Sequence, residues 1–140
     1  MARWSYEQAL TGGLELPILK NDLAFLLAVQ SRDLNRAKVL ALQASRGMPE
    51  HAGVLDTLGY VLLQLEDYEG AVTQLLRGLT IARNNSSPQA ELHYHLGLAY
   101  EALDRMNEAE SALAAALDQG EDFPDKQAAE TKLAKLRGEI

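Results

Sequence analysis

The stretch AGVLDTLGYVLLQLEDYEGAVTQLLRGLTIA, residues 52–82, decides the fold. Apolar residues recur at helical spacing on both sides of Glu66 and Asp67, so the stretch predicts two helices joined by a tight turn. Gly59 lies inside the first predicted helix, where a glycine costs about 1 kcal/mol relative to alanine. A glycine in such a place usually lets another helix approach closely, and the small Ala71 on the second helix is its expected counterpart.

The same pattern occurs downstream in AELHYHLGLAYEALDRMNEAESALAAAL, residues 90–117, and upstream in NDLAFLLAVQSRDLNRAKVLALQAS, residues 21–45. Each stretch has a small residue after a leucine, a short polar break, and then an alanine followed by further apolar residues. The small residues that recur in register are Ala24, Gly59 and Gly97 on the first helix of each pair, and Ala37, Ala71 and Ala109 on the second. The sequence therefore predicts a repeated helix pair with a period of 35 to 38 residues.

A helix pair that returns about every 34 residues is typical of tetratricopeptide repeats, and the chain resembles that family over roughly residues 18–119. The resemblance implies an all-α solenoid made of about three helix-turn-helix repeats within a single domain, 1–140. We expect the repeats at residues 17–47, 49–84 and 87–120. The longer step before the third repeat is expected to lie in the polar linker NNSS, residues 84–87.

Both ends of the array carry an additional predicted helix. Residues 4–11 are interpreted either as the second helix of a partial repeat or as a cap, in which Trp4 and Tyr6 cover the first repeat. Residues 124–138 have one narrow apolar stripe, which is typical of a helix that caps a repeat array. The residues Asn21-Asp22-Leu23-Ala24, Leu55-Asp56-Thr57-Leu58-Gly59-Tyr60 and Phe123-Pro124 together resemble the C-terminal repeats of long bacterial tetratricopeptide proteins.

The composition is that of a soluble globular chain, with 47% hydrophobic and 24% charged residues. The absence of cysteine excludes a disulfide framework and a thiolate metal site. No apolar run approaches the roughly 20 residues that span a bilayer, and the first ten residues lack the apolar core of a signal peptide. We therefore predict no membrane insertion, and a cytoplasmic or a periplasmic location remains open.

The formal net charge is −7, and residues 51–140 carry nearly all of the acidic excess. An acidic surface repels phosphate groups, so nucleic acid and anionic membrane surfaces are poor partners. No nucleophile with a base and no phosphate-binding loop appears. His93 and His95 are two residues apart on a predicted helix and cannot share a metal ion as a pair four residues apart can. We predict no enzyme, no cofactor and no metal site, with His93 in a packing position.

The candidate site is a surface. In the family, the first helix of each repeat lines a concave groove, and the resemblance carries eleven groove positions over to this chain. They are Asn21, Phe25 and Ala28; Asp56, Tyr60, Leu63 and Gln64; and Glu91, Tyr94, Leu98 and Glu101. This arrangement predicts an exposed line of three aromatic rings, Phe25, Tyr60 and Tyr94, edged by carboxylates. The alternative is that some of these rings belong to the core.

We expect a protein-interaction scaffold whose groove binds a peptide segment or a helix of a partner. Family members that hold a peptide's terminal carboxylate use basic groove residues, and the matching positions here carry no cation. A basic or apolar segment is therefore the better match. The alternative function is self-assembly into a homodimer through the N-terminal helix, with Trp4, Tyr6 and Leu10 as the apolar contact.

Overall fold

The structure is a computed structural model that describes residues 2–11 and 16–139, without the side chains of Ala2, Trp4, Leu10 and Thr11. Within these residues the chain forms eight helices and no strand. The helices are α1 (Ala2–Thr11), α2 (Pro17–Val29), α3 (Leu34–Gly47), α4 (Ala52–Gln64), α5 (Tyr68–Asn85), α6 (Ala90–Ala102), α7 (Met106–Asp118) and α8 (Lys126–Leu136). The prediction of an all-α fold is confirmed.

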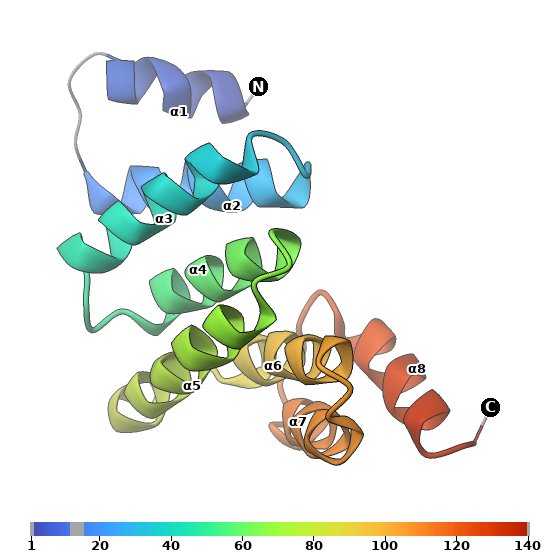
Figure 1. The fold of residues 1–140 in the computed structure, drawn as a ribbon. Coiled ribbons are helices and arrows are strands. Elements are labelled where there is room, and N and C mark those ends of the chain that lie inside the picture. Colours follow the sequence, from blue (N-terminus) through green and yellow to red (C-terminus); the bar gives the residue numbers. More distant parts are fainter. Residues whose placement is uncertain (1, 12–15, 140) are drawn as a thin grey trace.

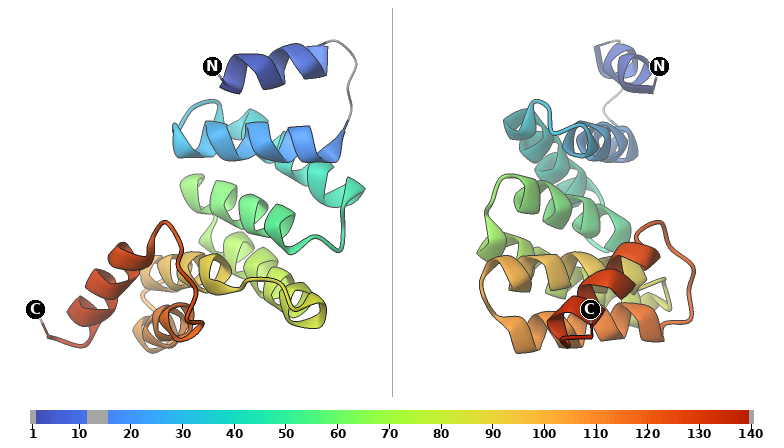
Figure 2. Two further views of the ribbon diagram at one scale, coloured as in Figure 1. Left: turned by 180° about the vertical axis from the view of Figure 1, so that it is seen from behind. Right: turned by 90° about the vertical axis from the view of Figure 1, so that its right-hand side faces the viewer.

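The helices stack as pairs along one axis (Figure 1). Helices α2 and α3, α4 and α5, and α6 and α7 form the three pairs, and each pair packs on the next. The first helices α2, α4 and α6 also contact one another directly, so they form one layer that faces the viewer on the left of Figure 2. We call the surface of this layer the inner face. The stack is an α-solenoid, as predicted.

Two glycines set how closely the paired helices approach. A Cβ atom added at Gly59 would lie 2.5 Å from Leu75 Cδ2, and one at Gly97 would lie 2.8 Å from Leu113 Cγ. Leu75 and Leu113 are fully buried. The same contact thus occurs in two successive pairs. The expected counterpart of Gly59 was Ala71, but the side chain that covers Gly59 is Leu75, one helical turn further along α5.

The turns within the pairs share one backbone feature. Ser31, Glu66 and Asp104 take up left-handed conformations, with φ of 52°, 64° and 60°. Each follows the first helix of its pair, so the chain reverses at corresponding points although no glycine is present. In the second pair, Asp67 then caps α5 by accepting a hydrogen bond from the Gly70 N–H at 3.0 Å.

Several helix ends differ from the predicted boundaries, and a side-chain cap accounts for one of them. Helix α4 begins at Ala52 and not at residue 49, since the His51 side chain caps it through the Val54 N–H. Helix α5 continues to Asn85, so the extra residues lengthen this helix and do not form a linker at 84–87. Helix α6 then begins at Ala90, and α8 at Lys126.

Both additional helices pack on the array. Helix α1 contacts α2, and ion pairs join Arg3 to Asp33 at 2.7 Å and Glu7 to Arg36 near the start of α3. The half-buried Tyr6 packs against the core. Whether α1 represents a partial repeat stays a prediction, and the side chains of Trp4 and Leu10 lie outside the described residues.

Helix α8 packs against α7, with Ala129 and Leu133 buried (Figure 1). Lys132 of α8 binds Glu101 at the end of α6 at 2.9 Å, and Arg137 binds Glu110 of α7 at the same distance. The C-terminal helix is therefore attached to both helices of the last pair.

The close approach at Gly59 predicts a position-specific effect of a large side chain. Gly59→Leu should lower the free energy of unfolding by about 2 kcal/mol or more, because Leu75 must move out of a filled core. Gly53→Leu is the control, since Gly53 lies on the exposed side of the same helix, where an added Cβ would meet only the exposed His51 ring, at 3.0 Å. That change should cost much less than Gly59→Leu, because an exposed ring can turn aside at the expense of its cap, whereas the buried Leu75 cannot. Chemical denaturation of the two variants distinguishes the positions, and equal stabilities would contradict the assigned packing.

Candidate functional site

A continuous line of ring contacts crosses the inner face. Ring centroids lie 5.9 Å apart between Phe25 and Tyr60, and 5.0 Å apart between Tyr60 and His95. The line continues from His95 to Tyr94 at 5.6 Å and from Tyr94 to Phe123 at 6.3 Å. We call these five residues the aromatic line. It connects α2, α4 and α6 with the segment that precedes α8.

The aromatic line is exposed to solvent at its Phe25 end and buried at its Phe123 end. Phe25 is 47% exposed and Tyr60 is half-buried, whereas Tyr94 is only 7% exposed. The expectation that Tyr94 is an exposed groove residue was wrong, because Tyr94 packs in a cluster with Phe123 and Leu133 of the C-terminal segment. Burial also raises the pKa of Tyr94, with the charges of Asp125 and Glu91 adding to the effect.

The remaining predicted groove residues are also accessible on α2 and α4 and covered on α6, with one exception. Asn21, Asp56, Leu63 and Gln64 are half-buried on α2 and α4, and Gln64 donates a hydrogen bond to the Tyr60 hydroxyl at 2.9 Å. On α6, Leu98 packs against the C-terminal cluster and Glu101 is paired with Lys132. Ala28 is fully buried in the core, so its predicted groove position was wrong. The part of the inner face that remains open to a partner is therefore formed by α2 and α4.

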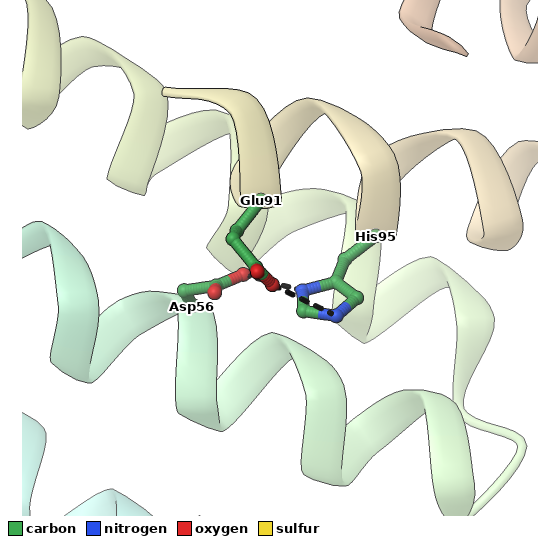
Figure 3. Close-up of side chains that lie close together, drawn as sticks. All are labelled: Asp56, Glu91 and His95. Carbon is green, nitrogen blue, oxygen red and sulfur yellow. Dashed lines mark hydrogen bonds and ion pairs between the residues drawn. The ribbon is translucent and has the colours of Figure 1, made fainter. Parts of the chain in front are cut away.

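Three polar side chains meet between α4 and α6 (Figure 3). His95 Nδ1 lies 2.7 Å from Asp56 Oδ1, and His95 Nε2 lies 3.9 Å from Glu91 Oε2. The His95 side chain is 4% exposed, while those of Asp56 and Glu91 are 19% and 35% exposed. Glu91 and His95 are one turn apart on α6, and Asp56 reaches them from α4. We call these residues the Asp56–Glu91–His95 cluster.

The two buried histidines of α6 have opposite electrostatic surroundings. Burial alone would lower the pKa of His95, but the charge and hydrogen bond of Asp56, with the charge of Glu91, raise it above 6.5. His93 lies in a packing position as predicted, and burial, assisted by the positive charge of Arg83, lowers its pKa below 6.5. Burial also raises the pKa of Glu91, although the charge of His95 opposes this.

An acidic cavity of about 680 Å³ lies beside the cluster. It is bounded by the start of α4, the start of α6 and the segment between α7 and α8. Five of its lining residues are acidic: Glu50, Asp56, Glu91, Glu121 and Asp122. Glu121 also accepts a hydrogen bond from the Ala90 N–H at 3.0 Å and so holds the segment against α6. A cavity with this lining attracts cations and repels carboxylates.

Sequence reasoning placed Asp56 and Glu91 on the inner face but missed the role of His95 and Phe123. The spacing of Glu91 and His95, four residues apart on one helix, was a signal that these side chains share a surface. The approach of Asp56 from the preceding pair had no comparable signal, because it depends on how the pairs are rotated relative to each other. Among the described residues, this cluster is the one group of three or more that could hold a metal ion.

The stacked helix pairs define the class of the protein, which is a helical repeat scaffold. Residues 52–85 and 90–119 match the tetratricopeptide repeat, so the second and third helix pairs are tetratricopeptide repeats. Repeats of this family generally mediate protein–protein interactions. No match was found among curated proteins.

The two matches coincide with the second and third helix pairs. The pair α2 and α3 lies outside them, so its assignment as a repeat at residues 17–47 stays a prediction. The narrower resemblance to long bacterial proteins also stays a prediction. None of the described helices has the length and apolar character that crossing a membrane requires.

The opposite shifts of the two histidines predict their order of titration. In NMR spectra of the imidazole rings, His95 should titrate above pH 6.5 and His93 below it.

By linkage, the His95 ion pair contributes stability that is complete below pH 6.5 and is lost as the pH rises through the raised pKa. The neutral His93 contributes stability that is present above pH 6.5 and is lost as the pH falls. Asp56→Asn should bring the His95 titration to lower pH, and an unchanged titration in this variant would contradict the pairing.

Proposed function

We propose that the inner face of α2 and α4 binds an extended or helical segment of another protein. The observation that carries this proposal is the open end of the aromatic line, where Phe25 is 47% exposed and in contact with Tyr60. Exposed aromatic rings bury a large area at low entropic cost when a partner covers them. Gln64, hydrogen-bonded to the Tyr60 hydroxyl, fixes the ring and so reduces that cost further.

Charge supports a basic or apolar segment as the partner. The net charge is −7, and the acidic cavity lies on the same side of α4 as the cluster residue Asp56. A lysine or arginine next to an apolar anchor would place the anchor on Phe25 and its own charge toward these carboxylates. Complementary charge of this kind increases the association rate and discriminates against acidic segments.

The C-terminal segment limits the length of the bound partner. Tyr94 is buried beneath Phe123, and Glu101 is occupied by Lys132, so α6 offers little of its inner face. The proposed partner is therefore a short segment that spans α2 and α4. Self-assembly through α1 has less support, because Tyr6, one of the residues of that hypothesis, is half-buried and packs against the core.

A random peptide library displayed on phage tests the proposal without knowledge of the natural partner. Peptides selected on the parent protein should be rich in lysine, arginine and apolar residues. The variant Phe25→Ala/Tyr60→Ala should bind them about tenfold or more weakly, because aromatic anchors dominate such interfaces. Affinity is measured by fluorescence anisotropy with the selected peptides.

Val39→Ala and Leu76→Ala are matched controls for that experiment. Val39 and Leu76 are 52% and 44% exposed, similar to Phe25, but they lie on α3 and α5 in the other layer. These two variants should bind the peptides as the parent does. Equal loss in the controls and in the Phe25/Tyr60 variant, or no loss in either, would contradict binding at the inner face.

A further inference from the structure

We propose that the Asp56–Glu91–His95 cluster is a binding site for a transition-metal ion, with Zn²⁺ as the best match. One donor atom from each of the three side chains can be chosen such that all three lie within 4.8 Å of one another. Figure 3 shows the three side chains pointing toward a common point between α4 and α6. The site goes beyond peptide binding, because it requires neither Phe25 nor a partner protein.

The donor set fits zinc. Zn²⁺ is held by histidine nitrogen at about 2.0–2.1 Å and by carboxylate oxygen at about 2.0–2.2 Å, usually with four ligands. Neighbouring donors around a tetrahedral ion of this size are about 3.3 Å apart. Only one nitrogen of the His95 ring can bind a given ion, and one donor atom from each of the three side chains lies within 4.8 Å of the other two. His95 Nδ1 and Asp56 Oδ1 are 2.7 Å apart, so an ion between them would replace the proton that they share, and the carboxylates would turn to reach the required separation.

The same donor set disfavours the hard cations. Ca²⁺ takes six to eight oxygen ligands and Mg²⁺ demands a nearly ideal octahedron of oxygens. An imidazole nitrogen is instead a ligand that suits zinc and its neighbours in the first transition series. We therefore expect discrimination between Zn²⁺ and Mg²⁺ and not a general affinity of an acidic surface for divalent cations.

The negative charges of Asp56 and Glu91 are not fully balanced by the side chains that contact them. Within the described part of the chain, the ion pairs of Asp56 and Glu91 are both made with His95, and no lysine or arginine approaches either carboxylate within ion-pair distance. The two carboxylates thus share a single imidazole. A divalent ion would balance both negative charges at once, in surroundings where partial burial makes the attraction stronger than in water.

The surroundings also hold the ligands in place and leave an entry route. The rings of Tyr60 and Tyr94 lie against the His95 ring at 5.0 and 5.6 Å, which fixes the orientation of the imidazole. Asp56 and Glu91 line the cavity of about 680 Å³, so an ion can enter from that side. Three protein ligands and an open position toward a cavity are the arrangement of a zinc site that can accept a fourth ligand.

Isothermal titration of the chelator-treated protein with zinc chloride tests the proposal. The parent should bind one equivalent of Zn²⁺, and an excess of Mg²⁺ should not compete. Glu91→Gln should weaken binding about tenfold or more, since it removes one of three ligands from a partly exposed position. Asp122→Asn is the matched control, because Asp122 is a carboxylate of the same cavity outside the cluster. Equal weakening by both changes, or no saturable binding to the parent, would overturn the proposal.

NMR of the parent protein gives a second readout that does not depend on any variant folding correctly. Added Zn²⁺ should shift the imidazole resonances of His95 more than those of His51, which lines the same cavity but lies outside the cluster. Thermal unfolding should also move to higher temperature with Zn²⁺, as expected for an ion that binds the folded chain. Shifts confined to His51 would assign the ion to an exposed surface residue and would overturn the proposed site.

Discussion

The close approach of the two helices in each pair is the constraint on which the rest of the structure depends. At Gly59 and Gly97 the missing side chain lets Leu75 and Leu113 lie directly against the backbone of the first helix. This contact fixes the rotation of α4 and of α6, and so decides which of their residues face the core and which face outward. Because the pairs stack with α2, α4 and α6 in direct contact, the outward residues of successive repeats form one continuous surface. The aromatic line and the Asp56–Glu91–His95 cluster both depend on this alignment.

The two ends of the inner face differ in their exposure to solvent, because the C-terminal segment covers only one of them. On α6 the surface is covered by Phe123 and by the ion pair between Lys132 and Glu101, which makes the last pair part of a second core cluster. On α2 the ring of Phe25 remains exposed. Between them, His95 combines apolar ring contacts with a buried ion pair to Asp56. The surface is therefore apolar at one end and acidic in the middle.

Much of the fold could be predicted from the sequence, because periodicity and small residues report directly on helix pairing. The positions of Gly59 and Gly97 aligned the repeats, and the groove positions carried over from the family then predicted Asp56, Tyr60 and Glu91 as groove residues. The helix ends were less predictable, since the His51 cap and the extension of α5 to Asn85 depend on local hydrogen bonds. The burial of Tyr94 could not be predicted, because it is caused by a segment nearly 30 residues away that folds back over α6. The meeting of Asp56 with His95 likewise depends on how two pairs are oriented.

The most direct test of this account is hydroxyl-radical footprinting of the folded parent protein, read out by mass spectrometry at individual side chains. The central claim is that the inner face is open at α2 and α4 and closed at α6. Phe25 and Tyr60 should therefore be modified readily, while Tyr94 and Phe123 should be protected until the chain unfolds. Modification of Tyr94 at the rate of Tyr60 would contradict the account, because the C-terminal segment could not then be covering the last repeat.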